Sequence, residues 1–374
     1  MWDLVIVGGG VCGLALGYGA SRRGQRVLVL DDRDALARPS RGNFGLIWVQ
    51  GKGVGFSDYA RITQASARLW PGFADELQQL TGVDLEYRPS GGLDFCLSPQ
   101  EVLEREAGLE ALHADTGLQT RMLNATELAC FLPGVGHVPG ASWCDMDAHV
   151  NPLMLLLALA QGIERRGGSV RRDEAVQQAE AGSDGVHLLL DGGKEIHGRH
   201  LLLCTGLGGE ALRDSLGVTL PVRGVKGQIL VTARQPPLLP FATAHLRQTA
   251  DGTVMCGDSW EEGDTGNQTQ TLVLGKIART ATRLLPALGQ ARMLRAWAAT
   301  RVITPDGAPL YQPSARYSNV HAVACHSGVT LAAWHALELA GLLAQHSGAP
   351  LLSMTTERFD VETNPNHRHR IGSH

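Results

Sequence analysis

The sequence has little that would place the chain in a membrane, on nucleic acid or around a metal ion. Its 374 residues contain no apolar run near the roughly 20 residues of a transmembrane helix, so we expect no membrane span. The formal net charge is −4, which gives no reason to expect a nucleic-acid partner. Seven scattered cysteines include no CxxC pair, so we predict reduced thiols in a cytoplasmic protein and no metal or iron–sulfur ligand set. Because the first apolar strand begins near residue 3, we also expect no cleavable signal sequence.

What is present is a dinucleotide-binding pattern at the start of the chain. The expected order is an apolar strand, a glycine turn, a helix and a second strand, at residues 4–7, 8–13, 14–23 and 26–30. In such a turn Gly8 permits the sharp bend, Gly10 lets the backbone approach a pyrophosphate, and Gly13 lets the helix pack on the strand. The helix N-terminus favours the anion, and Asp31 stands where a carboxylate accepts hydrogen bonds from a ribose. An acid at this position favours FAD or NAD over NADP.

The segment that follows, residues 38–55, is rich in glycine and small polar residues. A glycine-rich backbone can pass beneath a planar ring with little steric hindrance, which favours a cofactor contact. The alternative is a surface loop with no ligand. Farther along, an apolar strand at 200–204 runs into Gly206 without a second complete fingerprint, so we expect no separate nicotinamide site.

The remaining patterns predict an α/β protein, long enough for two domains or for one domain with an insertion. We expect a helix over residues 58–80 that is interrupted near Pro71-Gly72, and strands within 83–97 on either side of Gly91-Gly92. A hairpin turn is expected at Asp251-Gly252. Other helices are expected at 99–114, 125–133, 153–166, 268–285 and 329–345, and other strands at 169–176, 186–190, 200–204, 293–300 and 320–324.

Five motifs occur in an order that resembles the D-amino-acid oxidase family, which includes glycine oxidase and sarcosine oxidase. They are the fingerprint at residues 8–13, DAHVNP at 147–152, the strand ending in Cys204-Thr-Gly206, RVITPDGAP at 301–309 and CHSGVTL at 325–331. The resemblance covers nearly the whole chain. It implies a discontinuous, Rossmann-like FAD-binding domain of the GR2 type and an inserted antiparallel-sheet substrate domain that roofs the flavin. The implied FAD-binding segments are 1–82, 147–220 and 298–374, and the implied substrate-domain segments are 83–146 and 221–297.

The same resemblance implies oxidation of the C–N bond of an amino acid or secondary amine, by hydride transfer to flavin N5 and hydrolysis of the imine. Glycine, sarcosine, D-proline, D-hydroxyproline and opines all fit that class. Sarcosine oxidase carries its flavin on a cysteine where this chain has Ala299, so we expect non-covalent FAD. The residues that match cofactor contacts of the family are Gly8, Gly10, Cys12, Gly13, Asp31, Asp32, Arg41, Gly42, Asn43, Phe44, Gly45, Leu46, Val176, Cys204, Gly206, Arg301, Ser327, Gly328, Val329, Thr330 and Leu331.

Two residues match substrate-binding positions of the family. Arg301 matches the position that binds the substrate carboxylate, and a guanidinium offers a bidentate, permanently charged fork for that group. The alternative is an arginine in a structural salt bridge. His245 stands about where a tyrosine of glycine oxidase also meets the carboxylate, and a purely structural histidine is the alternative. Because they match substrate-binding positions, Arg301 and His245 are the candidate catalytic residues. The resemblance requires no side chain to act as a general base.

The stretches GNFGLIWVQGKG and CHSGVTLA look closest to the catalytic FAD subunits of multi-subunit bacterial dehydrogenases, of the opine oxidase, D-hydroxyproline dehydrogenase and hydrogen cyanide synthase kind. In those enzymes partner subunits with a second flavin and an iron–sulfur cluster take the electrons, whereas a stand-alone oxidase uses oxygen. Both arrangements stay open, as does a homo-oligomer. Two further classes are a flavoprotein acting on a substrate without a carboxylate, such as a polyol phosphate or a tRNA base, and a non-catalytic flavin-binding subunit. The moderate charge argues against tRNA, and the intact element at 301–309 argues against a docking subunit.

Overall fold

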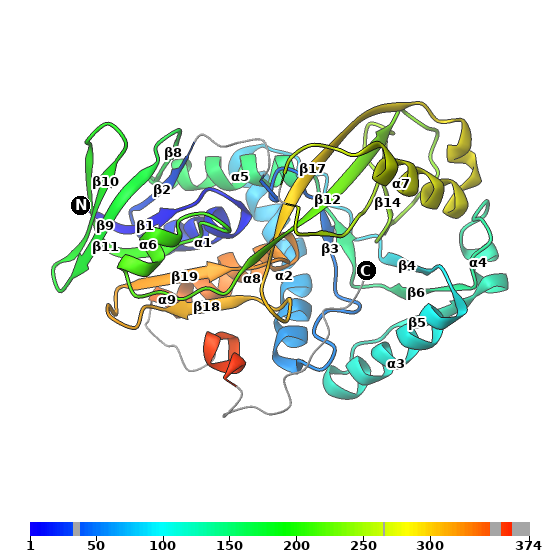
Figure 1. The fold of residues 1–374 in the computed structure, drawn as a ribbon, viewed down its shortest axis with the longest axis horizontal. Helices are drawn as coiled ribbons and strands as arrows, with labels where there is room; N and C mark the ends of the chain where they lie inside the picture. Colours follow the sequence, from blue (N-terminus) through cyan, green and yellow to red (C-terminus); the bar gives the residue numbers. More distant parts are fainter. Residues whose placement is uncertain (33–37, 265, 345–352, 361–374) are drawn as a thin grey trace.

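The computed structural model describes residues 1–32, 38–264, 266–344 and 353–360. Its largest element is an eight-stranded sheet, which lies at the left of Figure 1. The central strands run parallel, and three flanking pairings are antiparallel. In sheet order the main path is β18 (Leu310–Pro313), β19 (Val320–Ala324), β11 (Glu195–Leu203), β1 (Trp2–Val7), β2 (Val27–Asp31) and β8 (Ser169–Arg172), with β10 (Gly185–Leu190) and β9 (Val176–Gly182) continuing from β11.

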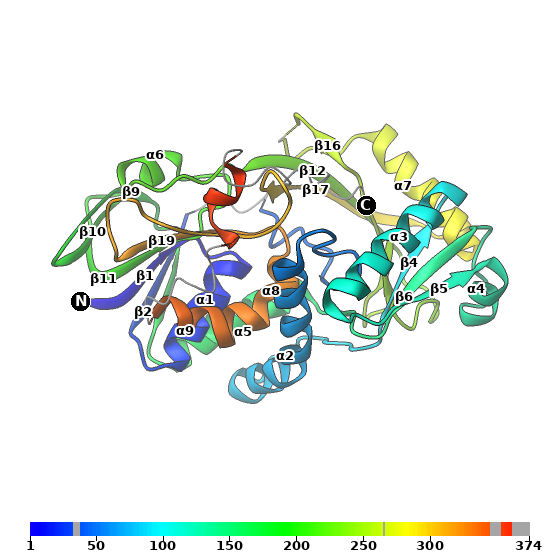
Figure 2. The same ribbon diagram turned by 90° about the horizontal axis from the view of Figure 1, so that it is seen from below.

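Helices cover the large sheet. Figure 2 shows α1, α5 and α9 on one side of the sheet and α6 on the other. The strands β1 and β2 are apolar, and α1 is buried on nearly all sides from Val11 to Ser21, so its burial between the sheet and the neighbouring helices positions it. The helices are α1 (Val11–Arg22), α2 (Ser57–Thr81), α3 (Pro99–Thr116), α4 (Ala125–Phe131), α5 (Pro152–Arg165), α6 (Glu210–Ser215), α7 (Thr271–Leu284), α8 (Gly328–Trp334) and α9 (Ala340–Ala344).

Antiparallel strands form the second part of the molecule, at the right of Figure 1. The long strands β12 and β17 pair over most of their length and extend between the large sheet and this part. One sheet contains β12 (Arg223–Thr232), β14 (Leu246–Gln248), β15 (Val254–Cys256), β16 (Glu261–Glu262) and β17 (Met293–Ile303), and a second contains β4 (Gly92–Cys96), β5 (Arg121–Asn124), β6 (Gly140–Cys144) and β13 (Ala242–Thr243). A short pair, β3 (Leu46–Ile47) and β7 (Ala148–His149), lies between the two parts.

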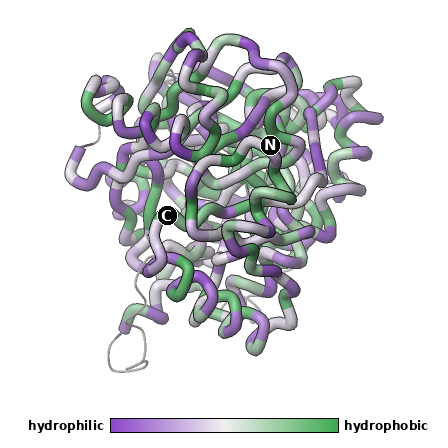
Figure 3. Tube along the Cα trace, turned by 90° about the vertical axis from the view of Figure 1, so that its right-hand side faces the viewer, coloured by the Kyte–Doolittle hydropathy of each residue, from purple (hydrophilic) through white to green (hydrophobic). Residues whose placement is uncertain are grey.

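The core follows this division. One buried cluster joins the sheet to α1, α2, α5 and α8, a second lies on the other face of the sheet, and a third fills the antiparallel part. In Figure 3 hydrophobic segments gather toward the middle of the view, and hydrophilic segments mark much of its periphery. The fold class is therefore as predicted: a Rossmann-like α/β unit built from separated segments, with an antiparallel-sheet insertion. The exact domain boundaries stay a prediction.

Three local predictions were wrong. The helix is not interrupted near Pro71, because α2 continues through it while Trp70 and Phe73 on either side are fully buried. Packing of this face offsets the hydrogen bond that a proline removes from a helix interior. Residues 83–89 do not form a strand, and Arg88 makes a single bridge to His149. The strand expected at 169–176 ends at Arg172, and Val176 begins the next strand.

The other expected elements are present, with ends shifted by a few residues. The turn at Asp251-Gly252 joins the antiparallel strands β14 and β15, as expected. The last predicted helix is divided: α8 leads into a π-helical turn at His335–Leu339 and then into α9. Its predicted end at Gln345 and the segment from 361 to 374 lie outside the described residues.

Candidate active site

Four chain segments that end parallel strands meet at one edge of the large sheet. In open α/β sheets this edge, beyond the carboxyl ends of the strands, is where ligands bind. Gly8 follows β1, Asp31 ends β2, Cys204 follows β11 and Cys325 follows β19. The sheet register places these segments beside each other, since β2, β1, β11 and β19 are consecutive neighbours.

The fingerprint glycines occupy positions where a side chain would not fit. Gly8 has φ +112°, and a Cβ there would lie 2.3 Å from the carbonyl oxygen of Cys204. A Cβ on Gly13 would lie 2.0 Å from the carbonyl oxygen of Gly8. Gly10 is the N-cap of α1 and has no side chain to cap it, so the helix N-terminus presents backbone amides at this edge of the sheet. The amide of Val11 donates to Ser40 Oγ at 3.0 Å.

The predicted ribose-binding acid lies beside this turn. Asp31 Oδ1 accepts a hydrogen bond from the amide of Gly9 at 2.8 Å, and its carboxylate forms an ion pair with Arg38. Asp32 is half-exposed and also pairs with Arg38. Asp31 is thereby fixed next to the glycine turn, which is the arrangement the sequence predicted for the adenosine side of a dinucleotide. Val176, predicted at the same side, begins β9 and is partly buried.

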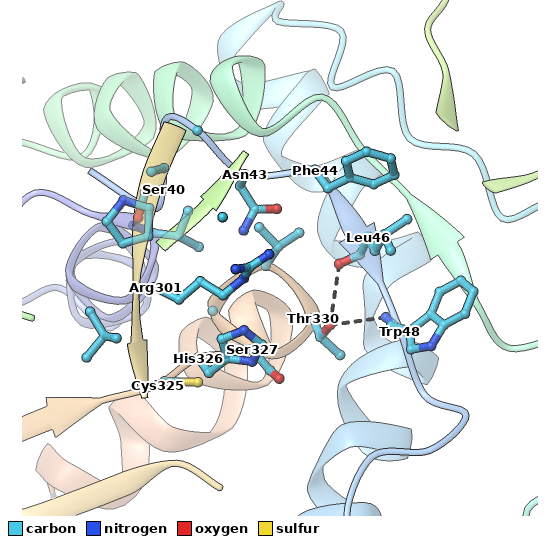
Figure 4. A pocket seen from close by; sticks show the side chains of 18 of the residues that line it. Ser40, Asn43, Phe44, Leu46, Trp48, Arg301, Cys325, His326, Ser327 and Thr330 are labelled. Atoms are coloured by element: carbon cyan, nitrogen blue, oxygen red, sulfur yellow. Dashed lines mark hydrogen bonds between the residues drawn. The ribbon is translucent and has the colours of Figure 1, made fainter. Parts of the chain in front are cut away.

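The segment from Arg41 to Leu46 passes along the same edge. A Cβ on Gly42 would lie 2.5 Å from the Cβ of Ala299, so the loop contacts β17 closely. Asn43 Oδ1 accepts a hydrogen bond from the amide of Gly45 at 2.7 Å. The side chain of Thr330 then joins the loop to α8: its Oγ1 accepts from the amide of Trp48 at 3.1 Å and donates to the carbonyl oxygen of Leu46 at 3.4 Å, as Figure 4 shows.

The N-terminus of α8 completes the edge. Ser327 is its N-cap, and Ser327 Oγ lies 2.6 Å from the hydroxyl of Tyr59. The thiols of Cys12 and Cys325, near the starts of α1 and α8, interact closely enough to shift each other's pKa. The interaction with Cys325 lowers the pKa of Cys12, whereas the interaction with Cys12 and burial raise the pKa of Cys325.

A cavity of about 190 Å³ lies between these segments and the antiparallel sheet. Figure 4 shows the side chain of Arg301 reaching into it from β17, between Asn43 on one side and His326 and Ser327 on the other. Ten of the residues predicted from the sequence line it: Cys12, Gly42, Asn43, Phe44, Leu46, Arg301, Ser327, Gly328, Val329 and Thr330. The other predicted residues lie around the strand ends or behind the cavity wall, at Gly8, Gly10, Gly13, Asp31, Asp32, Arg41, Gly45, Val176, Cys204, Gly206, Leu331 and His245.

Arg301 is held by the antiparallel sheet. Its Nη1 donates to the carbonyl oxygen of Ser259 at 2.9 Å, its Nη2 pairs with Asp258, and its guanidinium lies 5.6 Å from the ring centre of Trp260. The neighbouring strand gives it room, since a Cβ on Gly227 would lie 2.2 Å from Nη1. A guanidinium has five N–H donors, more than these contacts use, so it can also take a ligand carboxylate.

His245 lies less directly on the cavity. Its neighbour Ala244 is a lining residue, whereas the Nδ1 of His245 is buried without a hydrogen-bond partner in the described part of the chain. Burial lowers the pKa of this imidazole, which favours its neutral form. The structure therefore places His245 next to the site, and its contact with a substrate stays a prediction.

Sequence reasoning missed several lining residues, among them Lys52, Gly227 and Asp258. Gly227 and Asp258 belong to none of the quoted motifs, whereas Lys52 lies within the stretch GNFGLIWVQGKG without having been singled out. Lys52 did carry a signal, because it is the one charged residue among the glycines at 51, 53 and 55. Burial lowers the pKa of Lys52 to about 8.

One group of side chains has the composition of a metal site. His187, Glu195 and His197 offer ligand atoms within 4.8 Å of one another on β10 and β11. Glu195 and His197 are exposed, and no second feature points to an ion, so this group carries no further conclusion.

Comparisons with known proteins agree with this geometry. The sequence model of the family DAO, FAD dependent oxidoreductase, matches residues 3–342. The chain belongs to this family. It is 36% identical to the B subunit of opine oxidase from Rhizobium meliloti, over 96% of this chain and 98% of that protein. It is 38% identical to the B subunit of opine oxidase from Agrobacterium tumefaciens (strain Ach5), over 91% of this chain and 93% of that protein. The fold matches the crystal structure of glycine oxidase from Geobacillus kaustophilus with a TM-score of 0.85 at 23% identity, covering 92% of this chain and 95% of that one.

The family predicted from the five motifs is thus confirmed, and so is FAD as the cofactor. The residues present fit this group. The side-chain-free turn at Gly8 and Gly10, the amides of the α1 N-terminus and the carboxylate of Asp31 suit a pyrophosphate and a ribose. No described helix is both long and apolar enough to cross a bilayer.

Proposed function

We propose that this FAD-dependent oxidoreductase oxidises the C–N bond of an amino acid or secondary amine that carries a carboxylate. The observation that carries the proposal is the guanidinium of Arg301, which projects into the cavity that the Cys12, Asn43 and Ser327 segments border. The names of the relatives, opine oxidase and glycine oxidase, support this substrate class. FAD, when bound, supplies the acceptor for the substrate hydride.

The protein's own residues position and desolvate the substrate. Arg301 would bind the substrate carboxylate by paired charged hydrogen bonds, either in place of its ion pair with Asp258 or alongside it. Phe44, Ile229 and Trp260 give the cavity apolar walls, which exclude water and strengthen these electrostatic contacts. We propose no general base among these residues, and the amine would react in its neutral form.

Replacing the guanidinium tests this assignment. Arg301→Met should raise KM for the best amine substrate by about 10- to 100-fold, because a hydrogen bond to a charged group contributes about 1.5–3 kcal/mol. Arg223→Met, on the exposed end of β12, is the matched control and should leave KM unchanged. An Arg301→Met protein that binds FAD and keeps the wild-type KM would show that the arginine is only structural.

We also propose that electrons leave through partner subunits rather than to oxygen. The support is the name of the two relatives, each of which is the B subunit of an opine oxidase. A photoreduced or substrate-reduced chain should then reoxidise slowly in air and faster when the co-expressed partner subunits are present. Rapid reoxidation of the isolated chain by air would favour a stand-alone oxidase.

The location and domain limits are proposals of the same kind. All seven cysteines are free thiols, which supports a reducing compartment such as the cytoplasm.

We place the FAD-binding segments at 1–82, 147–220 and 298–374, with substrate-domain segments between them. The strands of the large sheet fall within the first set, and those of the two antiparallel sheets fall within the second except for residues 298–303 of β17.

A further inference from the structure

One short segment, residues 258–260, holds the guanidinium of Arg301. The carbonyl oxygen of Ser259 accepts a hydrogen bond from Arg301 Nη1 at 2.9 Å. The carboxylate of Asp258 pairs with Nη2, and the ring centre of Trp260 lies 5.6 Å from the guanidinium. None of the five motifs includes this segment. The position of the guanidinium therefore depends on what holds residues 258–260 in place.

The side chains of this segment alternate between the cavity and strand β12. Asp258 and Trp260 line the cavity. Ser259 and Glu261 contact Gln228 instead. The backbone amide of Gln228 donates to Ser259 Oγ at 2.9 Å, and its Nε2 donates to both carboxylate oxygens of Glu261 at 3.0 Å. Because successive side chains of an extended chain point to opposite faces, one face of the segment borders the cavity and the other is fastened to the protein.

Strand β12 shows the complementary alternation. Gly227 and Ile229 line the cavity, whereas Lys226 and Gln228 are buried on the opposite face of the strand. Strand β16 pairs antiparallel with β12, as Figure 2 shows, and this pairing sets Glu261 directly opposite Lys226. Residues directly opposite each other in an antiparallel pair share a face, so the carboxylate and the ammonium meet behind the cavity wall.

The carboxylate of Glu261 joins these contacts into one network. Its Oε1 accepts from Ser259 Oγ at 2.6 Å as well as from Gln228, and its Oε2 lies 3.7 Å from Lys226 Nζ. Lys226 also donates to Asp264 Oδ2 at 2.6 Å, farther along the same segment. The side chain of Glu261 is only 15% exposed. A charged acceptor in such a setting makes stronger hydrogen bonds than a neutral one, so it fixes Ser259 firmly.

We propose that Glu261 is a positioning residue for Arg301 and thereby sets the affinity of the site for the substrate carboxylate. It acts through Ser259, because it holds the hydroxyl of the residue whose carbonyl oxygen orients Arg301 Nη1. Glu261 does not line the cavity, so its effect reaches the substrate only through the arginine. This inference rests on the proposed function and adds to it the part of the protein that orients the substrate-binding guanidinium.

An unreactive ligand measures the effect without turnover. (Methylthio)acetate carries one carboxylate, and calorimetric titration follows its binding to the FAD-loaded chain. Glu261→Ala should weaken this binding about tenfold, as expected when a hydrogen bond to a charged group is lost or misplaced. Glu180→Ala, at an exposed position on β9, is the matched control and should leave the affinity unchanged. An unchanged affinity in Glu261→Ala overturns the proposal.

A double-mutant cycle separates positioning of the arginine from general support of the fold. Once Arg301→Met has removed the guanidinium, Glu261→Ala should weaken ligand binding by less than about twofold more. An equal loss in the wild-type and Arg301→Met backgrounds would show that Glu261 supports only the fold, and would overturn the proposal. With reactive amines, Glu261→Ala should raise KM about tenfold and leave kcat within about twofold.

Ser259 supplies a second pair of variants that does not depend on the folding of Glu261→Ala. Ser259→Ala removes the hydroxyl that Glu261 holds but keeps the backbone carbonyl that binds Arg301, and it should weaken (methylthio)acetate about tenfold. Ser259→Thr keeps a hydroxyl and should retain most of the wild-type affinity. Visible absorbance of the flavin checks that each variant is loaded with FAD. Equal affinities in the two Ser259 variants would overturn the proposal.

The same series separates failure of this inference from failure of the proposed function. If Arg301→Met weakens the ligand as expected but Glu261→Ala does not, the positioning role is wrong and the proposed function stands. If Arg301→Met leaves the affinity unchanged and no carboxylate-bearing amine bleaches the flavin, both are wrong.

Discussion

At the scale of single residues, the site depends on a missing side chain as much as on a charged one. Arg301 could be predicted because it opens RVITPDGAP, one of the motifs that carry the family resemblance. Gly227 could not, since its role follows from the register of β12 against β17, which brings it over the guanidinium. Asp258 pairs with Arg301 across 43 residues of sequence, and no local pattern marks that pairing.

Gly227→Ala should displace the guanidinium without unfolding the protein. The new methyl would meet the flexible end of Arg301 rather than backbone, so the arginine moves and the strand keeps its place. KM for a carboxylate substrate should rise about tenfold, in line with loss of one charged hydrogen bond, while FAD stays bound. Gly182→Ala, at the exposed end of β9 with open space around it, is the control and should change nothing. An unchanged KM in Gly227→Ala would show that the arginine's position is unimportant.

At the scale of elements, the sequence pattern predicted those helices and strands whose formation depends on residues close together in the chain. The strand, glycine turn, helix and strand at residues 2–31 were predicted because apolar runs, glycines and length coincide there. The interruption predicted at Pro71 is absent, because burial of Trp70 and Phe73 against the core outweighs the broken helix hydrogen bond. The apolar residues near 83–89 gave a strand-like pattern, but they find burial without a neighbouring strand to pair with over their length.

The close packing of α1 against the π-helical turn before α9 can be tested by substitution. A Cβ on Gly19 would lie 2.1 Å from the carbonyl oxygen of Ala336, which is backbone and cannot move cheaply. Gly19→Ala should therefore destabilise the protein by about 1–3 kcal/mol, as overpacking does. Gly72→Ala, within α2 and with nothing near it, should stabilise by roughly 0.5–1 kcal/mol. Chemical denaturation measures both, and an equal effect at the two positions would contradict the packing described.

At the scale of the whole molecule, the site is an assembly of distant segments. Its wall is built from residues within 11–12, 39–52, 227–229, 258–260, 299–302 and 325–330, together with Ala244. The order of motifs was enough to predict the family, the fold class and the cofactor, because each motif is a turn or strand end with local requirements. Lys52 shows what that order leaves out, since its place beside Arg301 exists only after the loop and β17 have packed together.

Anaerobic reduction of the bound flavin is the decisive experiment for the proposed oxidation of a carboxylate-bearing amine. The FAD-loaded chain would be mixed without oxygen with glycine, sarcosine, D-proline, D-hydroxyproline, iminodiacetate and an opine in turn, and the visible band of oxidised flavin followed. We predict that a carboxylate-bearing amine bleaches this band in the wild type, and only at a much higher concentration in Arg301→Met. A flavin that stays oxidised with all of these amines, and is reduced by a substrate that has no carboxylate, would contradict the proposed function.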